Sequence, residues 1–148
     1  MPQEKEQIYK LFKPQLTPKE MLELGVFGGS YFNEKQIREF PKYWFKKAKL
    51  SEKFNVKLNR FKIKSGLSRQ EWIKKGWIFK EDPLGWFQWY CRYTNGRRIQ
   101  KIDKIQIQRW INFIRHVKAI KKNCEESDLF CRRRQRQAIL QWAYDPFI

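Results

Sequence analysis

The 148 residues of this chain carry a formal net charge of +18, and 17% of them are aromatic. A chain of this length folds most simply as one domain, which can bury about 70% of the surface that the unfolded form exposes. The polar N-terminal run MPQEKEQ is unlike a secretion signal, and no apolar run is long enough to span a bilayer. We therefore expect an intracellular protein, nuclear, cytoplasmic or packaged in a particle, with no membrane partner.

The positive charge is spread over the whole chain. Residues 1–66 hold 15 basic and 7 acidic residues, and residues 67–148 hold 18 and 8. Self-repulsion of this size destabilises a compact fold unless a polyanion relieves it. Nucleic acid, either DNA or RNA, is therefore the expected partner.

The first part of the chain predicts an extension followed by short helices. Residues 1–16 are expected to form a polar extension or a frayed helix, and residues 17–148 a single basic helical domain. The run TPKE at 17–20 is a capping box with proline in the first helical turn, and Gly25 ends the helix that it starts. The glycines at 25, 28 and 29 indicate a tight turn between helices, because their spacing matches no phosphate-binding motif.

Further short helices are predicted from Asn33 to Phe40 and after Pro41. Residues 54–63, FNVKLNRFKI, alternate apolar and polar residues in two phases, which suits a small β-hairpin or an extended excursion. A second capping box, SRQE at 68–71, starts a helix that Gly76 ends.

The stretch DPLGWFQWYCRYTNGRR at 82–98 is the predicted centre of the fold. Asp82 and Pro83 have the chemistry of a helix start, and Asn95-Gly96 has that of a helix end. At about 100° per residue, its apolar side chains cover most of the circumference, and a helix that is apolar nearly all round is a buried one. It would deliver Arg97 and Arg98 to the surface at its C-terminal end.

Two helices complete the prediction. Asp103 is expected to cap the longest, which runs to about Lys122, and Asp128 to cap the last, which stops before Asp145-Pro146. The predicted fold is mainly α: a compact single domain of short helices around the central aromatic helix. One small β-hairpin near 54–63 is an open alternative to an extended segment.

Candidate binding residues lie on the polar side of the long helix, at the end of the central helix and in the arginine-rich run CRRRQRQ at 131–137. Lys and Arg neutralise phosphates, and Asn, Gln and Arg can also contact base edges. A solvated basic face has the same pattern. In the arginine-rich run, Arg134 is expected to share an exposed stripe with Gln137 and Gln141. Arg132 and Arg136 are nearly as well suited to packing against the protein as to contacting phosphate. The predicted nucleic-acid-binding residues are Arg92, Arg97, Arg98, Lys101, Lys104, Gln108, Arg109, Asn112, Arg115, His116, Arg132, Arg133, Arg134 and Arg136.

No catalytic site, metal site or cofactor is predicted. His116 has no neighbouring nucleophile in the sequence, and helix ends account for all four aspartates. Cys91 is expected in the core. Cys124 and Cys131 bracket a short acidic loop, which leaves pairing open, and their spacing from His116 is not that of a usual zinc site.

Three runs carry a resemblance: TPKEMLELGVFGG at 17–29, DPLGWFQWYCRY at 82–93 and RQRQAILQWAYD at 134–145. Together they resemble a scattered family of short basic, Trp-rich proteins without an assigned function. The resemblance implies a self-contained small domain and assigns no catalytic or binding residue.

The sequence thus predicts a non-enzymatic nucleic-acid-binding protein that holds the phosphate backbone with little sequence preference, in DNA packaging or ribonucleoprotein association. Two alternatives stay open. One is a nucleic-acid-processing enzyme of the nuclease or repair type, with His116 and a nearby glutamate as candidates. The other is a structural subunit of a ribonucleoprotein or virion.

Overall fold

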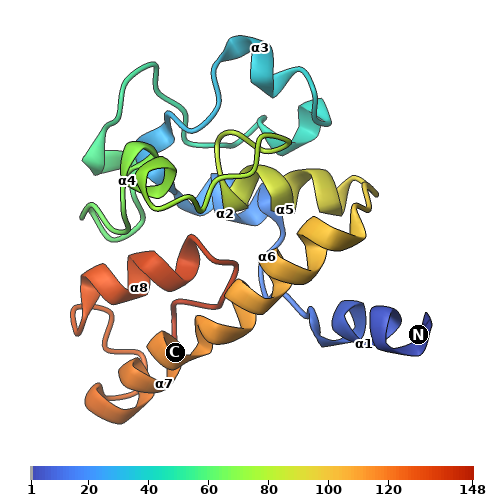
Figure 1. Cartoon of the computed structure of the whole chain (residues 1–148). Helices are drawn as coiled ribbons and strands as arrows, with labels where there is room; N and C mark the ends of the chain where they lie inside the picture. Colours follow the sequence, from blue (N-terminus) through green and yellow to red (C-terminus); the bar gives the residue numbers. More distant parts are fainter. Residues whose placement is uncertain (1) are drawn as a thin grey trace.

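The computed structural model describes the backbone of residues 2–148 and the side chains of residues 7–148. Within this range the regular structure consists of α-helices and short 3₁₀ helices, with no strand, which confirms the predicted mainly α fold (Figure 1). The elements are α1 (Pro2–Leu11), α2 (Pro18–Leu24), η1 (Phe27–Gly29), α3 (Glu34–Ile37), η2 (Lys42–Trp44), η3 (Val56–Leu58), α4 (Arg69–Lys74), α5 (Trp86–Thr94), α6 (Gln100–Asn112), α7 (Ile114–Asn123) and α8 (Arg133–Leu140).

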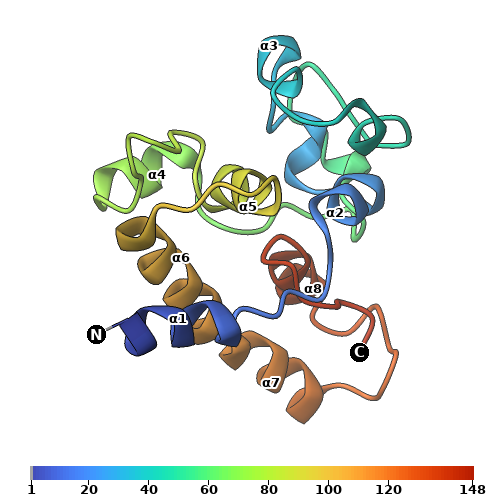
Figure 2. The same ribbon diagram turned by 90° about the vertical axis from the view of Figure 1, so that its right-hand side faces the viewer.

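The longest straight part of the molecule is formed by α6 and α7. In both views α7 continues in the direction of α6 (Figures 1 and 2), and only Phe113 separates the two helices. The N–H of Phe113 is shared between the carbonyls of Arg109 and Trp110, as in a tightened last helical turn. The predicted helix to Lys122 is therefore present, but it starts earlier, at Gln100, and is interrupted once.

The central aromatic helix is α5. Every residue from Trp86 to Cys91 is buried, so the predictions of a buried helix and of a core cysteine are confirmed. The helix does not begin at Asp82: Gly85, with φ at 115°, occupies the N-cap position, and α5 starts with the next residue. The carboxylate of Asp82 does not cap α5 but binds Arg92 and Arg97.

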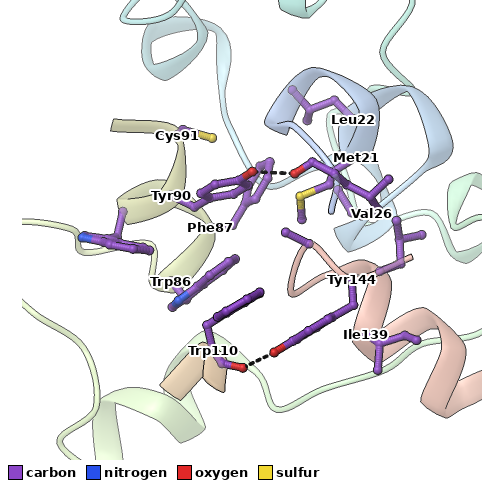
Figure 3. Packing of buried hydrophobic residues seen from close by; sticks show 14 of the residues in the cluster. Met21, Leu22, Val26, Trp86, Phe87, Tyr90, Cys91, Trp110, Ile139 and Tyr144 are labelled. Carbon is purple, nitrogen blue, oxygen red and sulfur yellow. Dashed lines mark hydrogen bonds between the residues drawn. The ribbon is translucent and has the colours of Figure 1, made fainter. Parts of the chain in front are cut away.

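The core around α5 is built of aromatic rings from distant parts of the chain (Figure 3). The rings of Trp86 and Tyr90 stack with centroids 5.2 Å apart. Those of Trp110, from α6, and Tyr144, near the end of the chain, stack at 4.9 Å with nearly parallel planes, and the Tyr144 hydroxyl donates to the Trp110 carbonyl. Aromatic stacking adds to the stability gained by burying apolar area.

Asp103 joins three helices in this core. It is buried, and its carboxylate accepts hydrogen bonds from the Tyr9 hydroxyl of α1 (2.8 Å), the Trp89 indole of α5 (2.8 Å) and the Ile99 N–H (3.0 Å). Burial, with the hydrogen bond to Asp103, raises the pKa of Tyr9 to about 12, which keeps the hydroxyl protonated as a donor. The N-terminal segment is thus tied to the core: residues 2–11 form a helix, and Phe12 is buried. Asp103 lies inside α6, not at its cap as predicted.

The segment 54–63 forms η3 and loops, and no hairpin. Apart from local turn bonds, its backbone bonds to the glycine turn of residues 25–29: Asn55 N–H donates to the Gly28 carbonyl (2.9 Å) and Arg60 N–H to the Gly25 carbonyl (3.0 Å). Gly25 has φ at 110°, and a Cβ on it would lie 2.0 Å from the Leu58 carbonyl oxygen. Only glycine allows this close approach, which explains the turn without any phosphate.

The local helix-start signals have mixed outcomes. Thr17, Asn33 and Ser68 each form the predicted helix start, with reciprocal hydrogen bonds to the residue three positions on. Asp128 does not cap the last helix. It accepts from the N–H of Phe130 in a local turn, and α8 begins five residues later, at Arg133.

Candidate nucleic-acid interface

A basic ridge follows the exposed side of α6 and α7. We use this name for the exposed residues Lys101, Lys104, Gln108, Asn112, Arg115, Lys118, Lys121 and Lys122. Seven of them follow one another at intervals of three or four residues, which places them along one side of a helix, and Lys121 lies next to Lys122 but further round the helix axis. The first five are predicted binding residues. The last three are not, although they continue the same period beyond Arg115.

No exposed acidic side chain interrupts this ridge. Asp103 is the sole acid between residues 100 and 123, and it is buried under three hydrogen bonds. Within residues 7–148, whose side chains are described, none of the six cations of the ridge takes part in an ion pair. Their charge is therefore available to a partner.

The length of the ridge suits a polyanion. At about 1.5 Å per residue, residues 100–123 extend over about 36 Å. A strand of duplex DNA carries one phosphate for every ~3.4 Å of helix axis, so a rod of this length passes about ten phosphates of one strand. Six exposed cations on such a rod can each meet a different phosphate.

Arg92 and Arg97 are partly exposed and bind the buried carboxylate of Asp82. Arg97 makes two hydrogen bonds to the buried carboxylate of Asp82, at 2.8 and 2.6 Å, and Arg92 makes a third at 3.0 Å. Arg92 also pairs with both oxygens of Glu39 at 2.7 Å, and this pairing, together with Asp82, raises the pKa of Arg92. Arg92 and Arg97, both predicted binding residues, therefore connect the C-terminal end of α5 to Asp82, which precedes the helix.

Arg98 is exposed, and its guanidinium lies over an aromatic ring. Its guanidinium carbon is 3.5 Å from the centroid of Tyr93, and one nitrogen donates to the Tyr93 carbonyl at 2.8 Å. This is a cation–π arrangement, and the same guanidinium carbon lies 5.8 Å from the centroid of the Tyr9 ring.

Arg109 connects α6 to the segment after α4. One of its nitrogens donates to the Trp77 carbonyl (2.9 Å) and to the Gln106 side chain (3.0 Å). Desolvation by burial lowers the pKa of Arg109. Arg109 is therefore not part of the ridge, because its guanidinium is half-buried and hydrogen-bonded within the protein.

The arginine-rich run divides into residues that point inward and outward. Arg136 is buried and donates to the carbonyls of Cys131, Pro146 and Ile148, and Arg133 donates to the Phe61 carbonyl. Arg132 and Arg134 are exposed.

The predicted exposed stripe through Gln137 and Gln141 is wrong, because both glutamines are buried. Gln137 accepts from the Phe61 N–H and donates to the Gly25 carbonyl, which ties α8 to the glycine turn. These partners are distant in the sequence.

The remaining polar candidates are His116 and the cysteines of the acidic loop. His116 Nδ1 lies 3.0 Å from the Gln135 amide, and burial, with the charge of Arg115, lowers its pKa. Cys124 and Cys131 form a disulfide, which settles the pairing left open by the sequence. Among the described residues, no three His, Cys, Asp or Glu side chains are grouped so that they could hold a metal ion.

No helix within residues 2–148 combines the length and the apolar character needed to cross a bilayer. No family model matches the chain, and neither a curated protein nor a solved structure matches it.

Proposed function

We propose that this chain is a non-enzymatic nucleic-acid-binding protein that holds the phosphate backbone along the basic ridge. The observation that carries the proposal is the row of six exposed, unpaired cations on one rod of about 36 Å, with the only acid of that segment buried. Proteins that neutralise phosphates with such rows gain affinity from the release of counterions. DNA packaging and association with ribonucleoprotein are roles that suit this mode of binding.

The composition of the ridge favours weak sequence preference. Five of its six cations are lysines, which bind phosphate as point charges, whereas four arginines with the fork geometry for base edges are engaged inside the protein. The two amides of the ridge, Gln108 and Asn112, bond to each other at 3.0 Å. Contacts of this kind position a nucleic acid more than they read it.

The disulfide gives information about the redox compartment in which such a protein would act. Disulfides persist in oxidising surroundings, including the surfaces of virions and cells, and they are rare in the cytosol and nucleus. Of the intracellular settings that the sequence predicts, the Cys124–Cys131 bond therefore favours a packaged particle.

Removing charge from the ridge tests the proposal. The test variant carries glutamine at Lys101, Lys104, Arg115 and Lys118. Its affinity for DNA at low salt is expected to fall about 100-fold, and its log–log salt slope to flatten by about 3, because each lost phosphate contact contributes about 0.7–0.9. Fluorescence anisotropy with labelled single-stranded and duplex DNA measures both quantities.

A variant with the same change in net charge is the control. It carries glutamine at four exposed lysines on η2 and the loop that follows it: Lys42, Lys46, Lys47 and Lys53. Its affinity should fall less than 10-fold, since it loses only the long-range part of the attraction. Equal losses in the two variants would show that net charge alone governs binding, against a defined site on the ridge.

A further inference from the structure

Trp77 follows the C-terminal end of α4, where a backbone hydrogen bond and a ring contact with Trp72 fix its position. Gly76, with φ at 72°, follows α4 in the left-handed conformation, and the Trp77 N–H donates to the Trp72 carbonyl at 3.0 Å. This is the backbone pattern of a Schellman motif. It turns Trp77 back against Trp72, so that the two rings meet nearly at right angles with centroids 5.3 Å apart.

The ring of Trp77 is the outer member of a row of aromatic rings. Behind it, Trp72 stacks on Trp142 at 5.9 Å, and Trp142 in turn packs on Trp86 of the core at 4.7 Å. Trp77 nevertheless remains 39% exposed. An aromatic ring that is held from behind and open to solvent loses little conformational entropy when it binds a second ring.

Trp77 also adjoins the basic ridge. Its carbonyl accepts from Arg109, the α6 residue directly after Gln108 of the ridge. The ammonium of Lys75 is 5.0 Å from the Trp77 ring centroid, and Lys74 and Lys80 are exposed nearby in the sequence. The exposed acid of α4, Glu71, is engaged in the cap of that helix. The ring therefore lies in basic surroundings.

We infer that Trp77 stacks on an unpaired base of a single-stranded nucleic acid whose phosphates lie along the ridge. The inference rests on the proposed function and names the form of nucleic acid that the same site prefers. Bases of a duplex are stacked on each other and closed to a side chain, whereas those of a single strand present free faces to aromatic rings. Lys75, which lies near the ring, is placed to pair with a phosphate of the bound strand.

Phe130 provides a contrast within the same molecule. It is 87% exposed, more than Trp77, but it lies in the loop closed by the disulfide. That loop carries three exposed acids and no basic residue: Glu125, Glu126 and Asp128. The acids repel a phosphate backbone within this loop, although the exposed Arg132 and Arg134 follow it in the sequence, so Phe130 is the control for an exposed ring on an acidic loop.

The test compares Trp77→Ala, Trp77→Phe and Phe130→Ala on single-stranded and duplex DNA of the same length. Trp77→Ala should weaken single-strand binding about 10-fold, which is within the range of one lost stacked base, and duplex binding less than twofold. Trp77→Phe should retain most of the single-strand affinity, and Phe130→Ala all of it. Quenching of tryptophan fluorescence by oligothymidine, smaller in Trp77→Phe than in wild type, checks the contact in a variant that keeps an aromatic ring.

The outcomes separate this inference from the function on which it rests. If both forms of DNA bind to the wild type but Trp77→Ala changes neither affinity, or weakens both equally, base stacking at Trp77 is overturned and backbone binding stands. If neither form binds to the wild type, the proposed function itself is wrong.

Discussion

Replacing Asp82 with asparagine is expected to lower the free energy of unfolding by about 3 kcal/mol, because it breaks a buried ion pair by removing one partner. The Asp82 side chain is fully buried and accepts hydrogen bonds from both Arg97 and Arg92. Asparagine keeps the shape but has one acceptor oxygen, and its amide turns two donors toward the guanidinium groups. Arg97 then keeps its charge without a counterion.

Glu39→Gln is the control for this change. Glu39 pairs with the same Arg92, but its side chain is 41% exposed, so its loss should cost less than about 1 kcal/mol. Urea denaturation followed by circular dichroism gives both values. Similar small losses in the two variants would mean that Asp82 does not hold the ends of α5 together.

Arg136→Ala is expected to lower the free energy of unfolding by about 3 kcal/mol, although Arg136 belongs to the run that the sequence marks for nucleic-acid binding. Its guanidinium donates to the carbonyls of Cys131 (2.7 Å), Pro146 (2.9 Å) and Ile148 (2.7 Å). The substitution leaves these carbonyls without their donor and opens a cavity at a fully buried position. Burial also lowers the pKa of Arg136, as expected for a charge that lacks a solvent shell.

The exposed Arg134 gives the comparison, two residues away on the same helix. Arg134→Ala should change stability by less than about 0.5 kcal/mol, since its side chain is at the surface. Thermal and chemical unfolding of the two variants, measured side by side, distinguishes them. If Arg136→Ala were as stable as Arg134→Ala, the buried guanidinium would have no part in joining the end of the chain to α8.

The parts of the fold that depend on neighbouring residues were predictable from the sequence. The helix starts at Thr17, Asn33 and Ser68 involve residues only three positions apart, and all three form. The burial of α5 follows from apolar side chains around its whole circumference. Asp82 and Asp103 have the same local chemistry as a cap, but tertiary partners recruit their carboxylates instead. No local pattern distinguishes the two uses.

The helical spacing of the candidate site was predictable from the sequence, but which of the arginines are exposed was not. A repeat of three to four residues indicates the exposed side of α6 and extends to Lys118 and Lys122 on α7. The arginines differ, because a long side chain with five donors can satisfy distant carbonyls or carboxylates that the sequence does not reveal. Arg97 and Arg136 are such cases. The local density of positive charge was therefore a poorer guide to the exposed, unpaired cations than helical periodicity.

The central claim is that the ridge binds the phosphate backbone, and the salt dependence of binding by the wild-type chain tests it most directly. Labelled single-stranded and duplex DNA and RNA of mixed sequence would be titrated over a series of salt concentrations. Six phosphate contacts predict a log–log slope of about −4 on a single strand and about −5 on duplex DNA, with little difference between sequences. Binding that does not weaken with salt, or no binding to any of the four nucleic acids, would contradict the account.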